Sequence, residues 1–195
     1  MNSFTYRVPT EVIFGRKTED QIGEILTRYG KKRAVLVFGS DRVKTSGLLL
    51  AIEKKLADKG IEYIEIGGVR PNPILSHARE AVKRSIEFDP DIIIGVGGGS
   101  ILDEAKAIAH GTANPDTDIW SFWNGDVKLT KTMSVASVLT IAAAGSETSN
   151  SAVLTNDETG IKRGLGTELN RPLFTIMDPE LTFTQIGRAS CRERV

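Results

Sequence analysis

The chain has 195 residues, of which 40% are hydrophobic and 26% are charged, so it is long and apolar enough to bury the core of a globular domain. Its 25 basic and 25 acidic residues balance, which argues against nucleic acid or a membrane surface as a partner. The sequence has no apolar run that could span a bilayer, and it opens without the charged and apolar regions of a signal peptide. We therefore expect a cytoplasmic protein.

The last eleven residues look foreign to the rest of the chain. Residues 185–195 lack apolar periodicity, contain the only cysteine, Cys191, and from Ile186 onward resemble the in-frame translation of a common sequencing adapter. We expect them to be a non-native tail and exclude them from reasoning about the fold. The native part is then expected to be residues 1–184.

The chain opens with two strand-like runs, 4–8 and 11–14, which we expect to form an N-terminal β-ribbon. Polar residues from Thr18 to Gln21 precede an apolar helical pattern, so a capped amphipathic helix is expected to follow and to end near Gly30.

Three β-α units come next. Strands are expected at 33–38, 61–66 and 91–96, and helices at about 46–59, 76–88 and 101–110, because strand-like runs rich in Val and Ile alternate with helical periodicity. The runs at 33–38 and 91–96 are nearly all apolar, as buried parallel strands are. Further strands are expected at 134–139, 151–155 and 173–177, and the aromatic stretch 119–123 should cover the sheet. This order predicts an α/β fold with a doubly wound, mostly parallel, Rossmann-like sheet. Ligands of such sheets bind beyond the carboxyl ends of the strands, so one crevice is expected at the loops after residues 38, 66, 96 and 139.

One of these loops has a composition typical of phosphate binding. Gly97-Gly98-Gly99-Ser100 follows the strand at 91–96 and begins a helix. Glycines can take positive φ and let a ligand approach the main chain, and the start of a helix attracts anions. Ser100 fits the N-cap and Asp103 the first turn. Since G-x-G-x-x-G is absent, the pattern predicts only a phosphate-bearing ligand, the alternative being a tight turn that binds nothing.

Four motifs in order carry a family resemblance. They are the Gly97–Ser100 loop with Asp103, residues 71–73, residues 140–147 and residues 178–182. Together they resemble the group III, iron-containing alcohol dehydrogenases, especially the butanol dehydrogenase branch, over residues 4–184. The resemblance implies that this chain is the dinucleotide-binding domain of such an enzyme.

The resemblance assigns residues in four loops, together with Lys162, to the cofactor. Gly98, Gly99 and Ser100 would hold the pyrophosphate, and their neighbours Gly97 and Asp103 are also expected at the cofactor site. Thr140 and Ser146 would line the nicotinamide and phosphate region, and Lys162 would reach the cofactor. Asn72, Gly39 and Ser40 would lie on the adenosine side. The family often has Pro and Thr where this chain has Ala142 and Ala144, so one hydroxyl contact to the cofactor is expected to be absent here.

The resemblance also implies a metal that this chain does not hold. In the family an Asp, a His four residues later and two further His bind iron or zinc, all beyond the Asp178-Pro179 motif. The two histidines here, His77 and His110, have no ligand spacing to partners and are expected to be ordinary helix residues. We therefore expect a helical C-terminal metal domain to be missing and no catalytic residue to be present. The full-length enzyme is expected to be a homodimer.

The expected reaction is metal-dependent hydride transfer between NAD(P) and a primary alcohol or aldehyde such as butanol or butyraldehyde. The chain alone is expected to be inactive. NADP is favoured over NAD, because Ser40 stands where NAD-restricted relatives have Asp, and Arg42 and Lys44 outnumber Asp41. Two alternatives stay open: a relative of glycerol dehydrogenase and dehydroquinate synthase, and a nucleotide-binding module without chemistry.

Overall fold

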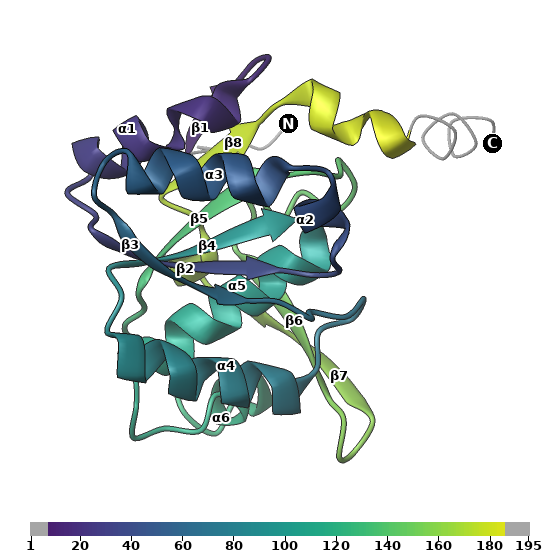
Figure 1. The fold of residues 1–195 in the computed structure, drawn as a ribbon. Helices are drawn as coiled ribbons and strands as arrows, with labels where there is room; N and C mark the ends of the chain where they lie inside the picture. The colour runs from purple at the N-terminus through teal and green to yellow at the C-terminus, as the bar shows by residue number, and fades with distance from the viewer. Residues whose placement is uncertain (1–7, 186–195) are drawn as a thin grey trace, which may run out of the picture.

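A six-stranded parallel sheet forms the centre of the molecule (Figure 1). The structure, a computed structural model, describes residues 8–185. The strand order is β1-β8-β5-β4-β2-β3. The strands are β1 (Glu11–Phe14), β2 (Arg33–Phe38), β3 (Glu62–Ile66), β4 (Ile92–Gly97), β5 (Ser134–Leu139) and β8 (Phe174–Met177). The bounds of β2 and β5 are those expected from the sequence.

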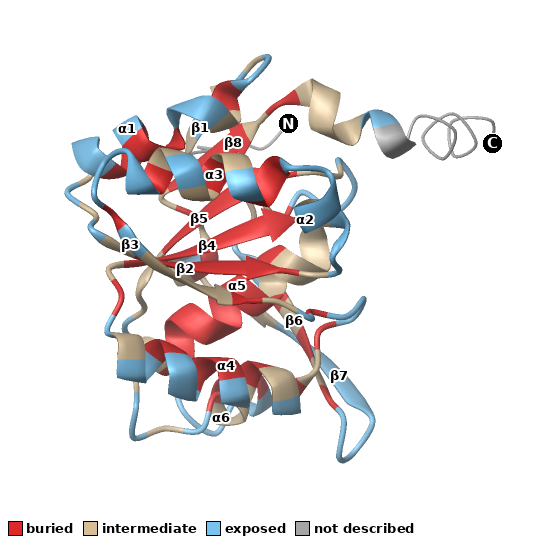
Figure 2. Ribbon diagram, viewed as in Figure 1, coloured by how far each residue is buried: buried red, intermediate tan, exposed pale blue. Residues whose placement is uncertain are grey.

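Helices cover both faces of this sheet, as the sequence predicts (Figures 1 and 2). On one face lie the 3₁₀ turn η1 (Thr18–Gln21), α1 (Ile22–Arg28) and α3 (Leu48–Ala57); on the other lie α4 (Leu75–Phe88), α5 (Gly99–Ala113) and α6 (Trp120–Asn124). The short α2 (Arg42–Thr45) follows β2, and the 3₁₀ turns η2 (Glu168–Asn170) and η3 (Pro179–Gln185) flank β8. The doubly wound α/β prediction is therefore confirmed.

The continuous apolar strands are explained by burial on both sides. Along β2, Ala34 and Leu36 pack in the core beneath α1 and α3, whereas Val35 and Val37 join the core beneath α4 and α5. All four are 0% exposed. Because side chains alternate along a strand, a sheet covered on both faces needs apolar residues at every position.

The expected N-terminal β-ribbon stays a prediction, because most of its first run lies outside the described residues. Strand β1 pairs in parallel with β8 and forms an edge of the main sheet. Run 4–8 falls outside the described residues except for Val8, which is not in a strand. The expected cap of the next helix is absent, because η1 has no side-chain cap and the Thr18 hydroxyl donates to the Gly15 carbonyl.

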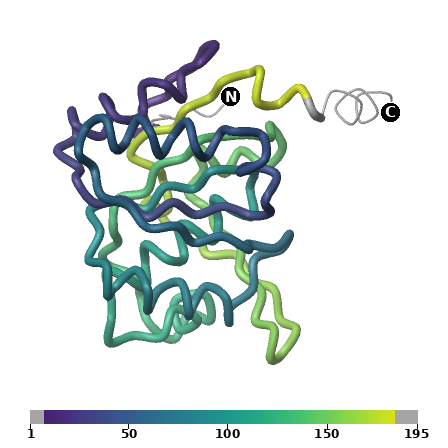
Figure 3. The backbone as a smooth tube through the Cα atoms, in the orientation of Figure 1, coloured from purple at the N-terminus to yellow at the C-terminus, as the bar shows by residue number. Residues whose placement is uncertain are grey.

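An antiparallel hairpin, β6 (Ser151–Asn156) and β7 (Ile161–Gly166), stands apart from the main sheet and projects beside α4 (Figure 3). The sequence predicted the first of these strands and not the second. Within residues 8–185, none of the helices combines the length and apolar character required to cross a bilayer.

Candidate functional site

The loops that follow the central strands meet at one edge of the sheet. Because β2, β3, β4 and β5 are parallel, their carboxyl ends lie on the same side. The N–H of Gly68 donates to the Gly39 carbonyl at 2.9 Å, and that of Thr140 donates to the Gly97 carbonyl at 3.1 Å. Loops predicted to form one crevice are therefore neighbours in space.

Of the three loop glycines, which the sequence suggested can take positive φ, Gly97 does so, with a φ of 159°. Gly98 has a φ of −95°. A Cβ on Gly97 would lie 2.1 Å from Cδ1 of Ile101, and one on Gly99 would lie 3.1 Å from the Cβ of Ala144. The start of α5 thus faces the loop after β5 across a narrow gap. Its first N–H groups have no acceptor within the helix and are suited to an anion.

Ser100 is not the N-cap of α5, contrary to the prediction. The cap position is occupied by Gly98, without a side-chain cap, and Ser100 lies inside the first turn. Its hydroxyl instead accepts a hydrogen bond from the N–H of Asn72 at 3.2 Å. The turn begins earlier than expected because Gly99 already has helical conformation. Ser100 therefore links the glycine loop to the loop after β3.

Asn72 and Lys162, predicted site residues far apart in sequence, are in direct contact. The ammonium of Lys162 donates to the side-chain oxygen of Asn72 at 2.6 Å. Asn72 has a φ of 59°, a left-handed conformation that asparagine tolerates better than most residues. Lys162, Asn72 and Ser100 therefore form a continuous polar path from the hairpin to the start of α5.

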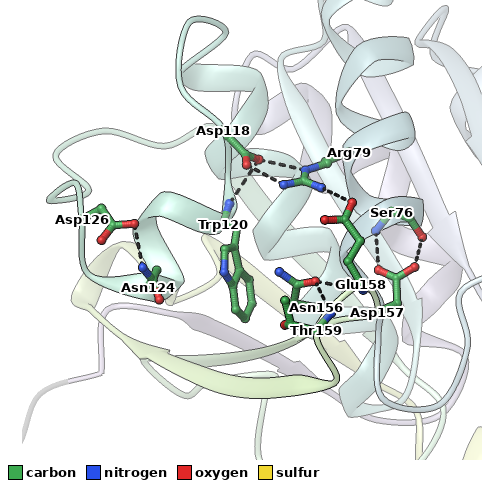
Figure 4. Close-up of polar contacts among 10 residues, drawn as sticks. All are labelled: Ser76, Arg79, Asp118, Trp120, Asn124, Asp126, Asn156, Asp157, Glu158 and Thr159. Carbon is green, nitrogen blue, oxygen red and sulfur yellow. Dashed lines mark hydrogen bonds and ion pairs between the residues drawn. The ribbon is translucent and has the colours of Figure 1, made fainter.

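The hairpin that carries Lys162 is fixed to α4 by its turn (Figure 4). Asp157 accepts hydrogen bonds from the N–H and the hydroxyl of Ser76 at 3.0 and 2.5 Å. Arg79 pairs with Glu158 at 3.2 Å and with Asp118 at 2.6 Å. These contacts hold the turn on the surface of α4, and thereby orient β7 toward the loop of Asn72.

A buried network beneath the site contains a residue that the sequence analysis missed, Lys106. It is 0% exposed, and its ammonium donates to the carbonyl and hydroxyl of Ser146, both at 2.8 Å, and to the Ser151 carbonyl at 2.9 Å. The Ser146 hydroxyl in turn donates to Asp103 at 2.7 Å. Asp103 also accepts from the N–H of Val153 at 3.2 Å. The hydroxyl of Ser146 and the carboxylate of Asp103 therefore join α5 to the loop after β5 and to β6.

Burial shifts the proton affinities in this network. It lowers the pKa of Lys106 to about 8, while the nearby Asp103 and Glu147 carboxylates oppose that change. Burial also raises the pKa of Asp103, against the hydrogen bond from Ser146 and the charge of Lys106. A signal was present in the sequence, because Lys106 stands in a run of Ala and Ile three residues after Asp103, where a buried charge needs local partners.

A pocket of about 440 Å³ opens beside the glycine loop, at the ends of β2 and β3. It holds the predicted Gly39 and Ser40, and its lining comprises Phe38, Gly39, Ser40, Asp41, Lys44, Glu65, Gly67 and Gly68. The ammonium of Lys44 pairs with the Glu65 carboxylate at 2.5 Å. The sequence analysis did not include Glu65, since it is the penultimate residue of a strand and its neighbours are not evident from the chain order.

The two histidines are engaged within the protein. His77 contacts Glu104 and the Gly67 carbonyl, and the Glu104 hydrogen bond raises its pKa. His110 is 0% exposed and hydrogen-bonds with Thr132 and Asn170 at 2.7 and 2.8 Å. Burial lowers its pKa to about 4. Over the described part of the chain, no three His, Cys, Asp or Glu side chains gather closely enough to bind a metal ion.

The parallel sheet, with helices on both faces and loops gathered at the carboxyl ends of its strands, defines a Rossmann-like α/β protein. The family model for iron-containing alcohol dehydrogenase matches residues 9–179. The chain therefore belongs to the iron-containing alcohol dehydrogenase family.

Similar proteins agree with this assignment. The chain is 38% identical to NADH-dependent butanol dehydrogenase A of Clostridium acetobutylicum and 32% identical to the NADPH-dependent aldehyde reductase YqhD of Escherichia coli, covering 94% of itself and 47% of each relative. The crystal structure of NADH-dependent butanol dehydrogenase A from Thermotoga maritima superposes with a TM-score of 0.91 at 36% identity, covering 94% of this chain and 46% of that one. The chain thus spans about half the length of the relatives it matches.

Proposed function

We propose that this chain is the cofactor-binding half of an enzyme that transfers hydride between NAD(P) and a primary alcohol or aldehyde, with butanol and butyraldehyde as candidate substrates. The observation that carries the proposal is the polar path from Lys162 through Asn72 to Ser100, which ends at the half-buried start of α5. A cation, an amide and unpaired N–H groups at one place suit a pyrophosphate. The family membership supplies the reaction class.

The cofactor would occupy the proposed site in three parts. The pyrophosphate would lie against the N–H groups of Gly99 and Ser100, where a Cβ on Gly99 would reach Ala144 and narrow the gap. The adenosine would occupy the pocket at Gly39 and Ser40. The nicotinamide would extend toward the loop after β5, whose small residues permit close approach. Ser146 and Asp103 would then act by positioning that loop, because their polar atoms bond to each other and to Lys106 and Val153.

The metal of the family does not fit the described residues. They contain no group of three candidate ligands, and both histidines are already hydrogen-bonded. We infer that iron or zinc would be held by residues of the full-length protein outside this chain. The chain alone would then lack the group that polarises the alcohol or aldehyde oxygen, and it would not catalyse turnover.

For the finer choice of cofactor we propose NADP over NAD. Ser40 offers a hydroxyl where an aspartate would repel the 2′-phosphate. Arg42 and Lys44 both lie on α2, the short helix that follows this loop. Charge-assisted hydrogen bonds from these residues favour a phosphate. Asp41 and Glu65 oppose it, so we expect a modest preference.

Extending the reading frame in the source DNA tests the function. We expect the continuation to encode a helix with Asp-x-x-x-His and two later histidines, and the full-length protein to reduce butyraldehyde with NADPH only when loaded with a divalent metal. A continuation without those ligands would contradict the metal-dehydrogenase proposal and would favour a nucleotide-binding module. Metal-dependent turnover by residues 1–184 alone would contradict the assignment of this chain as an inactive half. The homodimer stays a prediction.

A further inference from the structure

The pocket beside Gly39 has an unusual charge pattern. Among its lining residues, Lys44 is the one cation and faces two carboxylates, Asp41 and Glu65. A third carboxyl, Glu53 of α3, adjoins Glu65 and contributes to the charge around Lys44. A negatively charged group that enters the pocket therefore meets a cation whose charge is already compensated.

The pairing between Lys44 and Glu65 is direct. Their charged atoms are 2.5 Å apart, and the Lys44 ammonium also lies 5.1 Å from the centre of the Phe38 ring. The hydrogen bond to Glu65 is the main cause that raises the pKa of Lys44. In return Lys44 lowers the pKa of Glu65, although burial opposes this change. Both groups are therefore charged at neutral pH, with Lys44 oriented toward Glu65.

Glu53 reinforces this arrangement. Burial and its hydrogen bond with Glu65 raise the pKa of Glu53, whereas the same hydrogen bond lowers that of Glu65. Of the two carboxyls, Glu53 therefore takes a proton more readily than Glu65. Glu65 is thus kept ionised from both sides.

NAD and NADP differ at a single group that this charge pattern would sense. The 2′-hydroxyl of NAD can donate a hydrogen bond to a carboxylate, whereas the 2′-phosphate of NADP carries up to two negative charges and needs a free cation. A carboxylate beside that phosphate is a repulsive element of the kind that creates specificity. It also competes for the cation that the phosphate would use.

We propose that Glu65 is a specificity-determining residue, whose carboxylate competes with the 2′-phosphate of NADP for the ammonium of Lys44 and so limits the preference for NADP. This inference rests on the proposed dinucleotide site. Glu65 lines the pocket and would act on the cofactor both through its own charge and through Lys44.

The test compares two probes in the full-length protein: 2′,5′-ADP and 5′-AMP, which differ only in the 2′-phosphate. Dissociation constants are measured by calorimetry for wild type, Glu65→Gln, Lys44→Met and the double variant. Glu62→Gln is the matched control, since Glu62 lies on the same strand and pairs with Arg33 at 2.5 Å, away from the pocket lining. Thermal unfolding verifies that each variant is folded.

Glu65→Gln should tighten 2′,5′-ADP about tenfold and leave 5′-AMP within about twofold, a difference that corresponds to one lost like-charge contact. The gain should disappear in the double variant, and Glu62→Gln should change neither probe. Lys44→Met alone should weaken the binding of 2′,5′-ADP and not that of 5′-AMP. This variant tests the proposal independently if Glu65→Gln does not fold. Equal changes for both probes, or a gain that persists without Lys44, would overturn the role of Glu65. If wild type binds neither probe, the dinucleotide site itself is refuted, and this inference with it.

Discussion

The ammonium of Lys106 and the hydroxyl of Ser146 are 2.8 Å apart in the buried layer beneath the proposed cofactor site. Lys106 belongs to the helix that begins at the glycine loop, and Ser146 belongs to the loop after β5. Their contact, together with the bond from Ser146 to Asp103, fixes the two sides of the gap that would receive the pyrophosphate. In the proposed site this network would therefore act by holding the two sides of the gap in place.

Replacing Lys106 by Met should lower the free energy of unfolding by about 1–3 kcal/mol, because the carbonyls of Ser146 and Ser151 lose a buried donor. Urea unfolding of the full-length protein measures the change. Lys83→Met is the control, since Lys83 is exposed on α4 and contacts Glu80 only on the surface. A loss no larger than that of the control would show that the network contributes nothing to stability.

Acid should destabilise the protein through His110. Its folded pKa is about 4, below its ordinary value of 6.5, so the unfolded chain binds a proton in this interval while the folded protein does not. The free energy of unfolding should therefore fall as pH drops from 6.5 to 4, by about 3 kcal/mol at most. His110→Gln should flatten this dependence in urea unfolding measured across that interval.

His77 provides the matched control, because its pKa is shifted in the opposite direction. The hydrogen bond with Glu104 raises it, so its contribution to stability is complete below 6.5 and is lost as pH rises through the folded pKa. His77→Gln should therefore leave unchanged the fall in the free energy of unfolding between pH 6.5 and 4. If this fall persists in His110→Gln and disappears in His77→Gln, His110 is not the group that destabilises the protein in acid.

Gly99→Ala should separate folding from binding. The added Cβ would lie 3.1 Å from that of Ala144, inside the proposed pyrophosphate gap. Stability should change by about 1 kcal/mol or less, since alanine is the better helix former, while the affinity for NADPH and NADH should fall about tenfold or more. Gly166→Ala is the control, because a Cβ there meets no atom within 4 Å. Unchanged cofactor fluorescence titrations for Gly99→Ala would argue against this gap as the binding site.

Lys162→Met should weaken both cofactors to a similar extent, about fivefold to tenfold, because the ammonium would contact the pyrophosphate that they share. This outcome differs from that expected for Glu65→Gln, which separates the two cofactors. Lys128→Met, at another exposed lysine, controls for the loss of one charge. A selective loss of NADPH binding in Lys162→Met would place Lys162 at the 2′-phosphate instead.

The local parts of the fold could be predicted because their signals are local. The strands β2 and β5 are short, mostly apolar and almost entirely buried, and their bounds agree with the expectation to the residue. Strand β7 was missed because Ile161–Gly166 is largely exposed and contains two glycines, so it has neither an apolar run nor an alternating pattern. The pairing of β1 with β8 joins opposite ends of the chain, and no local pattern encodes such a partner.

The candidate site shows the same division. Residues of the glycine loop could be named from composition, and Asn72 and Lys162 from the family resemblance, and these lie close together in the structure. The apolar run around Lys106 indicates a buried charge, but its partners Ser146 and Ser151 could not be named, because only the folded chain brings them near. Glu65 has no such local signal, since its role depends on Lys44 and Glu53 from other elements.

Hydrogen-deuterium exchange of the full-length protein, with and without saturating NADPH, tests the central claim most directly. Binding at the carboxyl edge of the sheet predicts slower amide exchange in four segments, 39–44, 67–73, 98–102 and 140–146, and unchanged exchange in α1 and α6. Protection restricted to other parts of the chain, or no protection at a NADPH concentration that saturates binding, would contradict the proposed cofactor site.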